Sequence, residues 1–507
     1  MKEKTKSNRT ETKRTDRLTG QLLLRKQVKK KVNGDSEVAG MLGNVNCDSP
    51  LALLESALQA AKGLQPDLLV WTGDTLSHHQ ARLTQIASSL SYEQGQERFR
   101  LSREAALWTF KNATDAISRI LPGVPVFPAL GNHDFYPANT DPGPEGKTRQ
   151  WLTSALANDI WSKWLSEDEA RRSFAWGGFY RMPLQTYGGS GSRPEPETTY
   201  VIGLNTEVCH MKNYYAFSDE TNASEQLAWL RASLMELDRM GGRAIIIGHI
   251  PPGLWSGCWG EYSEEYEQVV SDFEDVILAQ FYGHDHSGSF RIFYGGDDLG
   301  DEVDGNDGND GNSTSPAPVS VAHVTPSLTP FKDQYPSFRV YEVGVDAAGA
   351  ESQSGVIGFT QYFLDLAKYA GIPGNDEVVA WFVSFRAPKS LGLANLSPES
   401  WKFVADKLLS NTTIRDDFVK LWANGRPFMG TKGLLRTYAC GARHVKIKDL
   451  IECSKQNEEQ FIRDYTGNQH TYVLTTMFSF DVLFAQFCNA MNGFLPEDCK
   501  IYQDAVL

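Results

Sequence analysis

Residues 283–286 read Gly283-His284-Asp285-His286 and follow an apolar run, residues 277–282, which is typical of a buried strand. Two histidines spaced two residues apart just beyond a strand can turn both imidazole rings toward one point. Imidazole is the commonest side-chain ligand of metals in proteins. Taken alone, the stretch is compatible with a metal-ligating turn and equally with an ordinary polar turn.

Three further apolar segments end in residues that can ligate a metal, and a glycine stands just before each ligand type, where it allows a tight backbone turn. Residues 68–74 end in Asp74, residues 124–134 end in Asn132-His133-Asp134, and residues 243–249 end in His249. Ligands of open α/β sheets bind beyond the carboxyl ends of the strands. The four segments together therefore predict one cluster of Asp, Asn and His side chains in an α/β protein.

The order GD, GNHD, GH and GHxH resembles the signature of the calcineurin-like metallophosphoesterases. Flanking residues narrow the resemblance to the acid sphingomyelinase-like phosphodiesterases, with the endopolyphosphatases as close relatives. These flanking residues are Cys47-Asp48-Ser49-Pro50, Trp71-Thr72-Gly73-Asp74, residues 127–134, residues 177–180, Leu204-Asn205-Thr206 and residues 281–284. The resemblance implies a four-layer α/β fold in which two packed mixed β-sheets are flanked by helices.

The resemblance also implies a metal-ligand set. One divalent ion takes Asp74, Asn132, His249 and His284, and a second ion shares Asp74 and takes His286 together with an Asp-x-His motif. Mixed His, Asp and Asn ligands with open positions suit zinc, with manganese or iron as alternatives. A metal-activated water would then attack phosphorus in line.

Catalytic roles follow from the same resemblance. His133 would stabilise the phosphate charge or protonate the leaving oxygen, and His78, four residues after Asp74, would share that task. Asp134 would orient His133 from behind. The alternative for each of the two histidines is a purely structural role.

The chain departs from the resembled family near its start. No Asp-x-His motif occurs before Cys47, and Asp35 has neither a strand before it nor a histidine after it. We therefore expect the first strand and the outer ligands of the first metal to be absent from this chain, so that one ion is well bound. Three functions remain open: an active phosphodiesterase, an endopolyphosphatase, and a catalytically impaired relative.

Composition and charge limit the classes of molecule that this protein is expected to bind. The 507 residues carry a net charge of −14, which argues against nucleic acid as the main partner, and they contain no apolar run long enough for a transmembrane helix. We expect a phosphodiester or polyphosphate substrate and a monomer. No signal peptide is visible, but the resemblance implies a secreted protein or one of the lysosome or vacuole lumen, which six Asn-x-Ser/Thr sequons and the cysteines weakly favour.

The domain organisation follows from composition. We expect a basic disordered segment at residues 1–40, the metallophosphoesterase domain at 41–365 with an acidic Asp/Gly-rich insertion at 295–316, and a helical, cysteine-containing lobe at 366–507. Of seven cysteines, the last four suggest two disulfides between sequential neighbours, Cys440 with Cys453 and Cys488 with Cys499. The metal-binding CxxC pattern does not occur.

Periodicity predicts the remaining elements. Ser49 is expected to cap a helix that starts at Pro50 and ends at Gly63. Further expected helices span residues 100–120, 147–172, 225–240, 398–409, 414–423 and 481–491, and further strands span 199–205, 319–324, 338–343 and 356–363.

Overall fold

The fold is seen in a computed structural model, which describes most of the chain between residues 40 and 453. The described ranges are 40–45, 47–78, 92–136, 138–143, 147–184, 199–213, 215, 221–253, 257–295, 316–331, 334–344, 354–369, 379–408, 410–424, 432–450 and 452–453. The basic segment 1–39, most of the acidic insertion, the helix expected at 481–491, and Cys488 with Cys499 lie outside these ranges.

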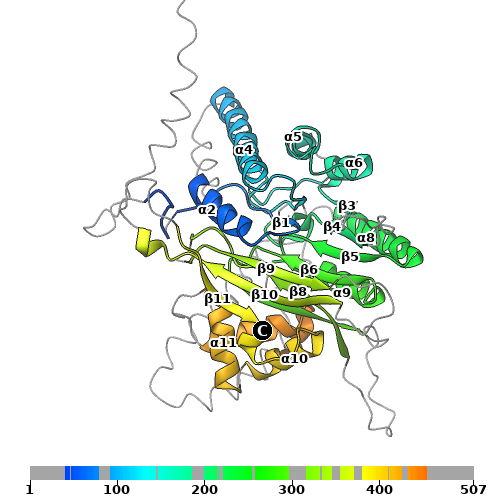
Figure 1. The fold of residues 1–507 in the computed structure, drawn as a ribbon. Helices are drawn as coiled ribbons and strands as arrows, with labels where there is room; N and C mark the ends of the chain where they lie inside the picture. Colours follow the sequence, from blue (N-terminus) through cyan, green and yellow to red (C-terminus); the bar gives the residue numbers. More distant parts are fainter. Residues whose placement is uncertain are drawn as a thin grey trace, which may run out of the picture.

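A six-stranded mixed sheet forms the centre of the molecule (Figure 1). Its strands are ordered β3 (Tyr180–Pro183), β4 (Thr199–Gly203), β5 (Arg243–Ile247), β6 (Ile277–Tyr282), β8 (Ala317–Val324) and β7 (Ser289–Gly295). The four inner strands are parallel and the two edge strands are antiparallel to their neighbours. Strands such as β5, with its run of isoleucines, are almost wholly buried, as expected for parallel strands covered on both faces.

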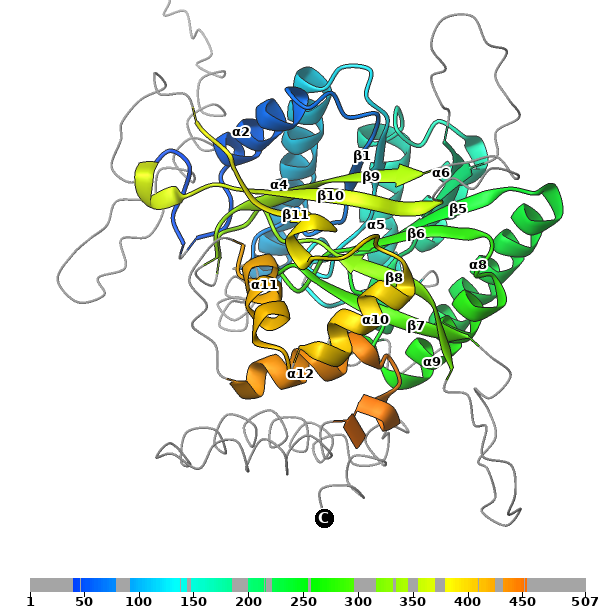
Figure 2. The same ribbon diagram turned by 60° about the horizontal axis from the view of Figure 1, so that its bottom comes forward.

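The second layer consists of two smaller sheets. β1 (Leu69–Trp71) pairs in parallel with β2 (Val126–Pro128), and β9 (Ser337–Gly344), β10 (Gly355–Phe363) and β11 (Phe382–Ala387) form an antiparallel sheet. Both pack on the same face of the large sheet, as Figure 2 shows. The expectation of two mixed sheets therefore holds only for the large sheet. Among the described residues no backbone ladder joins β1 to β9, so the second layer is one parallel and one antiparallel sheet and not a single mixed sheet.

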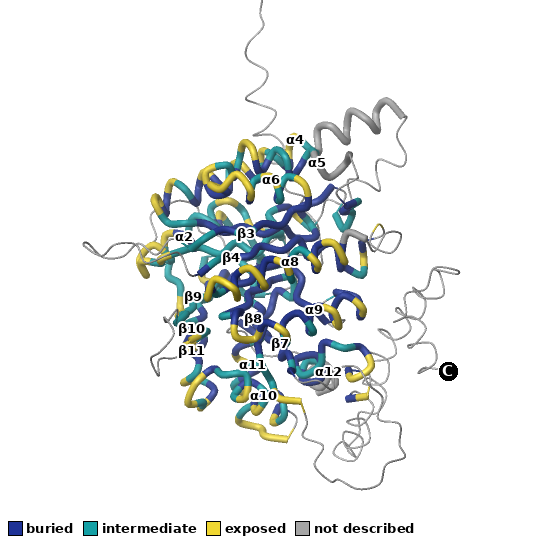
Figure 3. The backbone as a smooth tube through the Cα atoms, turned by 90° about the vertical axis from the view of Figure 1, so that its right-hand side faces the viewer, coloured by how far each residue is buried: buried dark blue, intermediate teal, exposed yellow. Residues whose placement is uncertain are grey.

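Helices cover the outsides of both β-layers, which confirms the four-layer architecture. On the large sheet lie α8 (Thr221–Met240) and α9 (Gly260–Asp272), whose apolar sides pack on the outer face of β4, β5 and β6. On the second layer lie α2 (Leu51–Lys62), α4 (Tyr92–Ile120), α5 (Lys147–Ala155) and α6 (Asp168–Gly177). Figure 3 shows buried strands enclosed by helices whose outer sides are exposed.

The C-terminal helices pack directly on the sheets. α10 (Pro398–Lys407), α11 (Thr412–Trp422) and α12 (Lys432–Arg443) join strands β7, β8, β10 and β11 in one apolar cluster around Trp401. The segment expected to be a helical lobe from residue 366 onward thus begins by adding a strand, β11, to the second layer.

Three local expectations change. The helix at residue 51 is preceded by Pro50 without a side-chain cap, because the Ser49 hydroxyl donates to the carbonyl of Leu328 instead. The single helix expected over 147–172 is broken by a π turn, Leu156–Ile160, before α6 begins. The disulfide Cys440–Cys453 is confirmed, and a further disulfide, Cys209–Cys258, was not anticipated. Within the described residues we find no helix with the length and apolar character needed to span a bilayer.

Candidate metal centre

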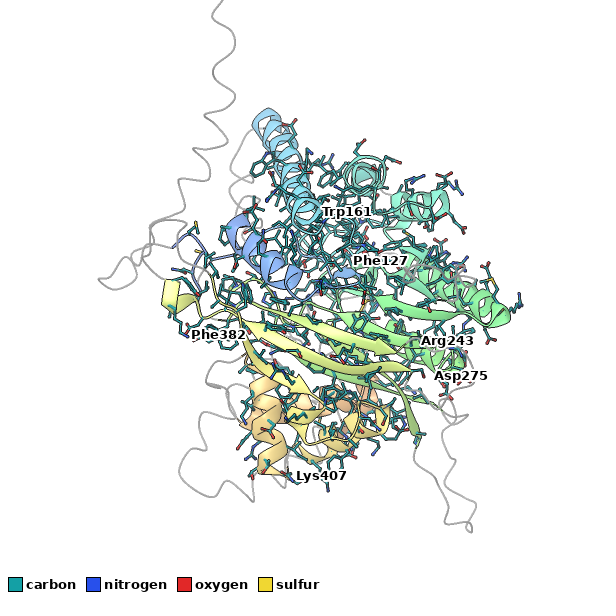
Figure 4. The ribbon with its side chains drawn as sticks, in the orientation of Figure 1. Phe127, Trp161, Arg243, Asp275, Phe382 and Lys407 are labelled. Carbon is teal, nitrogen blue, oxygen red and sulfur yellow. A yellow bond between two sulfur atoms is a disulfide. The ribbon has the colours of Figure 1, made fainter. Side chains whose placement is uncertain are left out.

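The predicted ligands follow two pairs of parallel strands, β1 with β2 and β5 with β6. Asp74 follows β1, Asn132 follows β2, His249 follows β5 and His284 follows β6. Figure 4 labels Arg243 and the nearby Asp275 at the opposite, amino-terminal ends of β5 and β6. The carboxyl ends of these strands therefore bring together side chains that are up to 210 residues apart (284 − 74).

Two glycines let the first two loops touch. Gly73 has a φ of +91°, and a Cβ placed on it would lie 2.7 Å from the carbonyl carbon of Leu130 and 2.9 Å from the Cα of Gly131. A Cβ on Gly131 would in turn lie 2.8 Å from the carboxylate carbon of Asp74. A real Cβ does not come this close to other heavy atoms. Only glycine at positions 73 and 131 therefore allows Asp74 to lie directly against the Asn132 loop.

The donor atoms of four predicted ligands converge. His249 Nε2 lies 3.1 Å from Asp74 Oδ2 and 3.1 Å from Asn132 Oδ1. His284 Nδ1 lies 3.0 Å from Asn132 Oδ1 and 3.3 Å from His249 Nε2. Because oxygen and nitrogen lone pairs directed at one point repel one another unless a cation lies between them, this donor set fits a divalent ion.

Hydrogen bonds behind the ligands fix which atom each presents. His249 Nδ1 lies 2.6 Å from the carbonyl oxygen of Thr72, to which it donates, and this leaves Nε2 for the centre. The Asn132 amide nitrogen donates to Asn139 Oδ1 at 2.8 Å, which turns its oxygen inward. Outer partners of this kind set the tautomer and orientation of metal ligands.

The backbone around the centre is strained. Asp74, His284 and His286 have φ values of +56°, +67° and +60°, which residues other than glycine rarely adopt. Such conformations each cost on the order of 1–3 kcal/mol and gather at functional sites. Strain at three predicted ligands supports a functional origin for this geometry.

Burial and neighbouring charges shift the pKa values of the predicted ligands. Burial would raise the pKa of Asp74, but His249 and His133 outweigh it and hold that pKa well below its usual range. Burial lowers the pKa of His284 far below its ordinary value, so this ring is neutral and able to ligate. Burial would also lower the pKa of His249, but Asp74 raises it overall.

The other predicted histidines form a neighbouring group. His78 lies 4.3 Å from His133 and 5.0 Å from His286, measured between ring centroids. The backbone N–H of His133 donates to Asp74 Oδ1 at 2.8 Å, so His133 sits directly against the ligand set. The donor atoms of Asp74, His78 and His133 also lie within 4.8 Å of one another. His286, which was predicted to ligate the other ion together with Asp74, thus lies next to His78, and its role as a ligand stays a prediction.

Asp48 supports His78, a contact that the sequence reading did not assign. Asp48 Oδ1 lies 2.6 Å from His78 Nδ1, and its Oδ2 accepts from the backbone N–H of His78 at 3.0 Å. A carboxylate only accepts hydrogen bonds, so Nδ1 of His78 carries the proton. Asp48 belongs to the Cys47-Asp48-Ser49-Pro50 motif, but no local pattern in the sequence indicates what its side chain contacts.

Asp134 contacts the main chain of two loops at the centre. Its carboxylate accepts hydrogen bonds from the backbone N–H groups of Gly131, Asp74, Thr75 and Leu76, at 2.7, 2.9, 2.6 and 3.3 Å. Both oxygens therefore accept hydrogen bonds from main-chain donors, and the orientation of the His133 ring by Asp134 stays a prediction. These hydrogen bonds fasten the Asp74 loop to the Asn132 loop.

Two buried groups near the centre were missed in the sequence. Asp285, between the two histidines of the GHxH motif, forms an ion pair of 2.8 Å with Arg291, whose side chain is 1% exposed. Glu207 and His210, in a short helical turn after β4, are 0% and 2% exposed and lie 3.1 Å apart. Leu204-Asn205-Thr206 pointed to this segment, but nothing in its pattern showed that it reaches His284.

Comparison with known proteins agrees with this geometry. A family model described as calcineurin-like phosphoesterase matches residues 42–288. Sphingomyelin phosphodiesterase from Homo sapiens is 32% identical over 397 residues, which cover 77% of this chain and 54% of that protein. Sphingomyelin phosphodiesterase B from Dictyostelium discoideum is 28% identical over 82% of this chain and 59% of its own length.

A relative of similar extent is acid sphingomyelinase-like phosphodiesterase 3b from Homo sapiens, which is 27% identical over 82% of each chain. The chain spans about half the length of the human sphingomyelin phosphodiesterase. The matched residues 42–288 include every predicted ligand and both predicted catalytic histidines. Residues 42–288 therefore form a calcineurin-like phosphoesterase domain, and the chain is similar to the acid sphingomyelinase-like phosphodiesterases.

Proposed function

We propose that the chain is a metal-dependent phosphodiester hydrolase. The observation that carries this proposal is the convergence of Asp74, Asn132, His249 and His284 on one point, with His133 and His78 beside it. Ligands and candidate acid–base groups then lie close enough to contact the same phosphate.

The four converging side chains would hold the ion. Two imidazoles, one carboxylate and one amide oxygen suit zinc best, with manganese and iron as alternatives. A divalent ion bound there supplies Lewis-acid polarisation of a phosphoryl oxygen and makes a water more acidic. Asp74 supplies the negative charge, and Thr72 and Asn139 keep His249 and Asn132 in their ligating orientations.

His133 is proposed as the proton donor to the leaving oxygen. Burial lowers its pKa to about 4, against the opposing effect of Asp74, so the ring is neutral at physiological pH in the absence of substrate. A phosphodiester anion beside the ring favours the protonated form and opposes this effect. The same proton can then pass to the leaving oxygen, a step worth roughly 10²- to 10⁴-fold in rate.

His78 is proposed to bind a phosphate oxygen. Its Nδ1 proton is held by Asp48, and its ring packs between His133 and Phe331, at centroid distances of 4.3 and 4.7 Å. Since Nδ1 is engaged, Nε2 is the atom of His78 that remains for a substrate oxygen.

The substrate class follows from the relatives. Those named above are sphingomyelin phosphodiesterases and a sphingomyelinase-like phosphodiesterase, which favours a phosphodiester such as sphingomyelin over the phosphoanhydride chains of an endopolyphosphatase. The two disulfides favour an oxidising compartment, and we propose that the protein works in the secretory or vacuolar route as a monomer.

Hydrolysis of bis-p-nitrophenyl phosphate, sphingomyelin and polyphosphate by the chain tests the proposal. We expect the metal-stripped protein to be inactive and to regain phosphodiesterase activity with Zn²⁺ or Mn²⁺. A clear preference for polyphosphate would replace the proposal with an endopolyphosphatase. Inactivity toward all three substrates with Zn²⁺, Mn²⁺ and Fe²⁺ would instead identify a catalytically impaired relative.

A further inference from the structure

His284 presents Nδ1 to the centre, so its Nε2 faces the other way. Nδ1 is the atom that lies 3.0 Å from Asn132 Oδ1 and 3.3 Å from His249 Nε2. His249 does the reverse, with Nε2 inward and Nδ1 bound to the carbonyl of Thr72. A ligating histidine almost always has such an outer partner, which raises the question of what supports the outer side of His284.

His210 lies on that outer side. Its ring centroid is 5.3 Å from that of His284, and the two planes meet at 80°. A Cβ placed on Gly257 would lie 3.5 Å from His210 Nε2 and 3.6 Å from His284 Nε2, so both nitrogens flank the same glycine. The far nitrogen of His210, Nδ1, lies 3.1 Å from Glu207 Oε2.

The Glu207–His210 pair is fully enclosed, and its position is held firmly. Cys209, next to His210, is bonded to Cys258, next to Gly257, and His210 and Cys258 also form an isolated antiparallel bridge. The backbone N–H of Met211 donates to the carbonyl of Gly257 at 2.6 Å. Covalent and main-chain bonds therefore hold His210 against the loop that faces His284.

A buried carboxyl and imidazole cost free energy unless all their polar atoms are hydrogen-bonded, and apolar residues would fill the same space in the core without that cost. Glu207 Oε1 has no hydrogen-bond partner within the described part of the chain, although the side chain is fully buried. His323, another buried histidine, packs instead among Phe281, Tyr341, Phe359 and Trp401, away from any predicted ligand. Core packing therefore accounts for His323 but not for a polar pair placed behind a ligand.

We propose that Glu207 and His210 form an outer support that fixes the ring of the metal ligand His284. This inference rests on the metal site of the proposed function. The carboxyl group orients His210, and His210 Nε2, which flanks Gly257 together with His284 Nε2, holds the outer side of the His284 ring so that Nδ1 stays aimed at the centre. The two groups are positioning residues, since neither reaches the ion or the substrate.

Cobalt binding provides the test, because Co²⁺ reports both affinity and ligand geometry through its visible absorption. The purified full chain is stripped of metal and titrated with Co²⁺, and its folding is checked by thermal unfolding without metal. His210→Phe keeps a ring of similar size but no nitrogen, Glu207→Leu removes the carboxyl, and Glu207→Gln keeps a hydrogen-bonding group. His323→Ala is the control for loss of a buried histidine elsewhere.

We expect His210→Phe and Glu207→Leu to weaken Co²⁺ binding roughly 10- to 100-fold and to shift the absorption bands, the usual consequence of losing an outer partner. Glu207→Gln should recover most of the affinity, and His323→Ala should bind as the wild type does even where it melts earlier. Wild-type affinity and spectrum in a folded His210→Phe protein would overturn this inference alone. Absence of Co²⁺ binding by the wild-type chain would overturn the metal site and this inference together.

Discussion

Substitution of Gly73 by alanine should separate the two loops that bring Asp74 and Asn132 together. Two effects add at this position. The φ of +91° costs an alanine roughly 1–2 kcal/mol, and its Cβ would lie 2.7 Å from the carbonyl carbon of Leu130. Relief of such an overlap between two backbones costs about another 1–3 kcal/mol.

Gly241→Ala is the matched control. Gly241 also has a positive φ, +68°, but a Cβ there would meet nothing within 4 Å. Both variants carry the cost of a positive φ, and only Gly73→Ala also carries the steric overlap. The difference in their stability therefore measures the cost of the close contact between the two loops.

We expect Gly73→Ala to unfold at a clearly lower temperature than Gly241→Ala and to bind Zn²⁺ about tenfold more weakly or worse, because the donor atoms move apart. Thermal unfolding of the metal-free proteins and competition with a chelator measure the two effects. Equal melting temperatures and equal Zn²⁺ affinities for the two variants would show that the contact between the Gly73 and Gly131 loops does not hold the ligands in place.

Three further outcomes are expected. Asp48→Asn should lower kcat on bis-p-nitrophenyl phosphate roughly 10- to 100-fold at unchanged metal content, because the carboxylate holds the His78 ring; an unchanged kcat would contradict this role. Burial raises the pKa of Glu267 to about 7, with Lys446 opposing, so its protonated form stabilises the fold at acid pH and this contribution is lost as pH rises through 7. Glu267→Gln should therefore raise the melting temperature at pH 8 and leave it nearly unchanged at pH 5, and an equal change at both would refute the assignment. Replacement of both Cys440 and Cys453 by alanine should destabilise the fold by about 3 kcal/mol without loss of Zn²⁺ affinity, which denaturant unfolding and chelator competition would check.

The convergence of the four predicted ligands could be expected from the sequence because the information for it is local. Asp74, Asn132, His249 and His284 each follow an apolar strand and a glycine, and each pair of parallel strands, β1 with β2 and β5 with β6, ends at one edge of its own sheet. Knowing four such segments was therefore enough to expect that these four residues meet. The strands themselves were predictable for the same reason, since short buried runs carry their own pattern.

The supporting residues were not accessible, because their roles depend on contacts between distant segments. Asp134 accepts hydrogen bonds from main-chain groups of a loop 60 residues earlier. Because every residue other than proline has a main-chain N–H, the sequence does not indicate which of these groups Asp134 contacts. Asp48 reaches His78 and Thr329, whose positions follow only from the complete fold. The support behind His284 depends on a disulfide, Cys209–Cys258, that residue spacing alone does not indicate.

Metal content and kcat of two neighbouring variants test the central claim most directly. We expect the wild-type chain to bind about one divalent ion tightly, through the four converging ligands. His133→Ala should keep that ion and lose roughly 10²- to 10⁴-fold in kcat on bis-p-nitrophenyl phosphate, because His133 moves a proton and is not a ligand. Asn132→Ala should lose metal affinity and rate together. Loss of the ion from His133→Ala would place His133 among the ligands, with Asp74 and His78. A His133→Ala protein with full metal content and wild-type kcat would contradict the mechanism at its proton-transfer step.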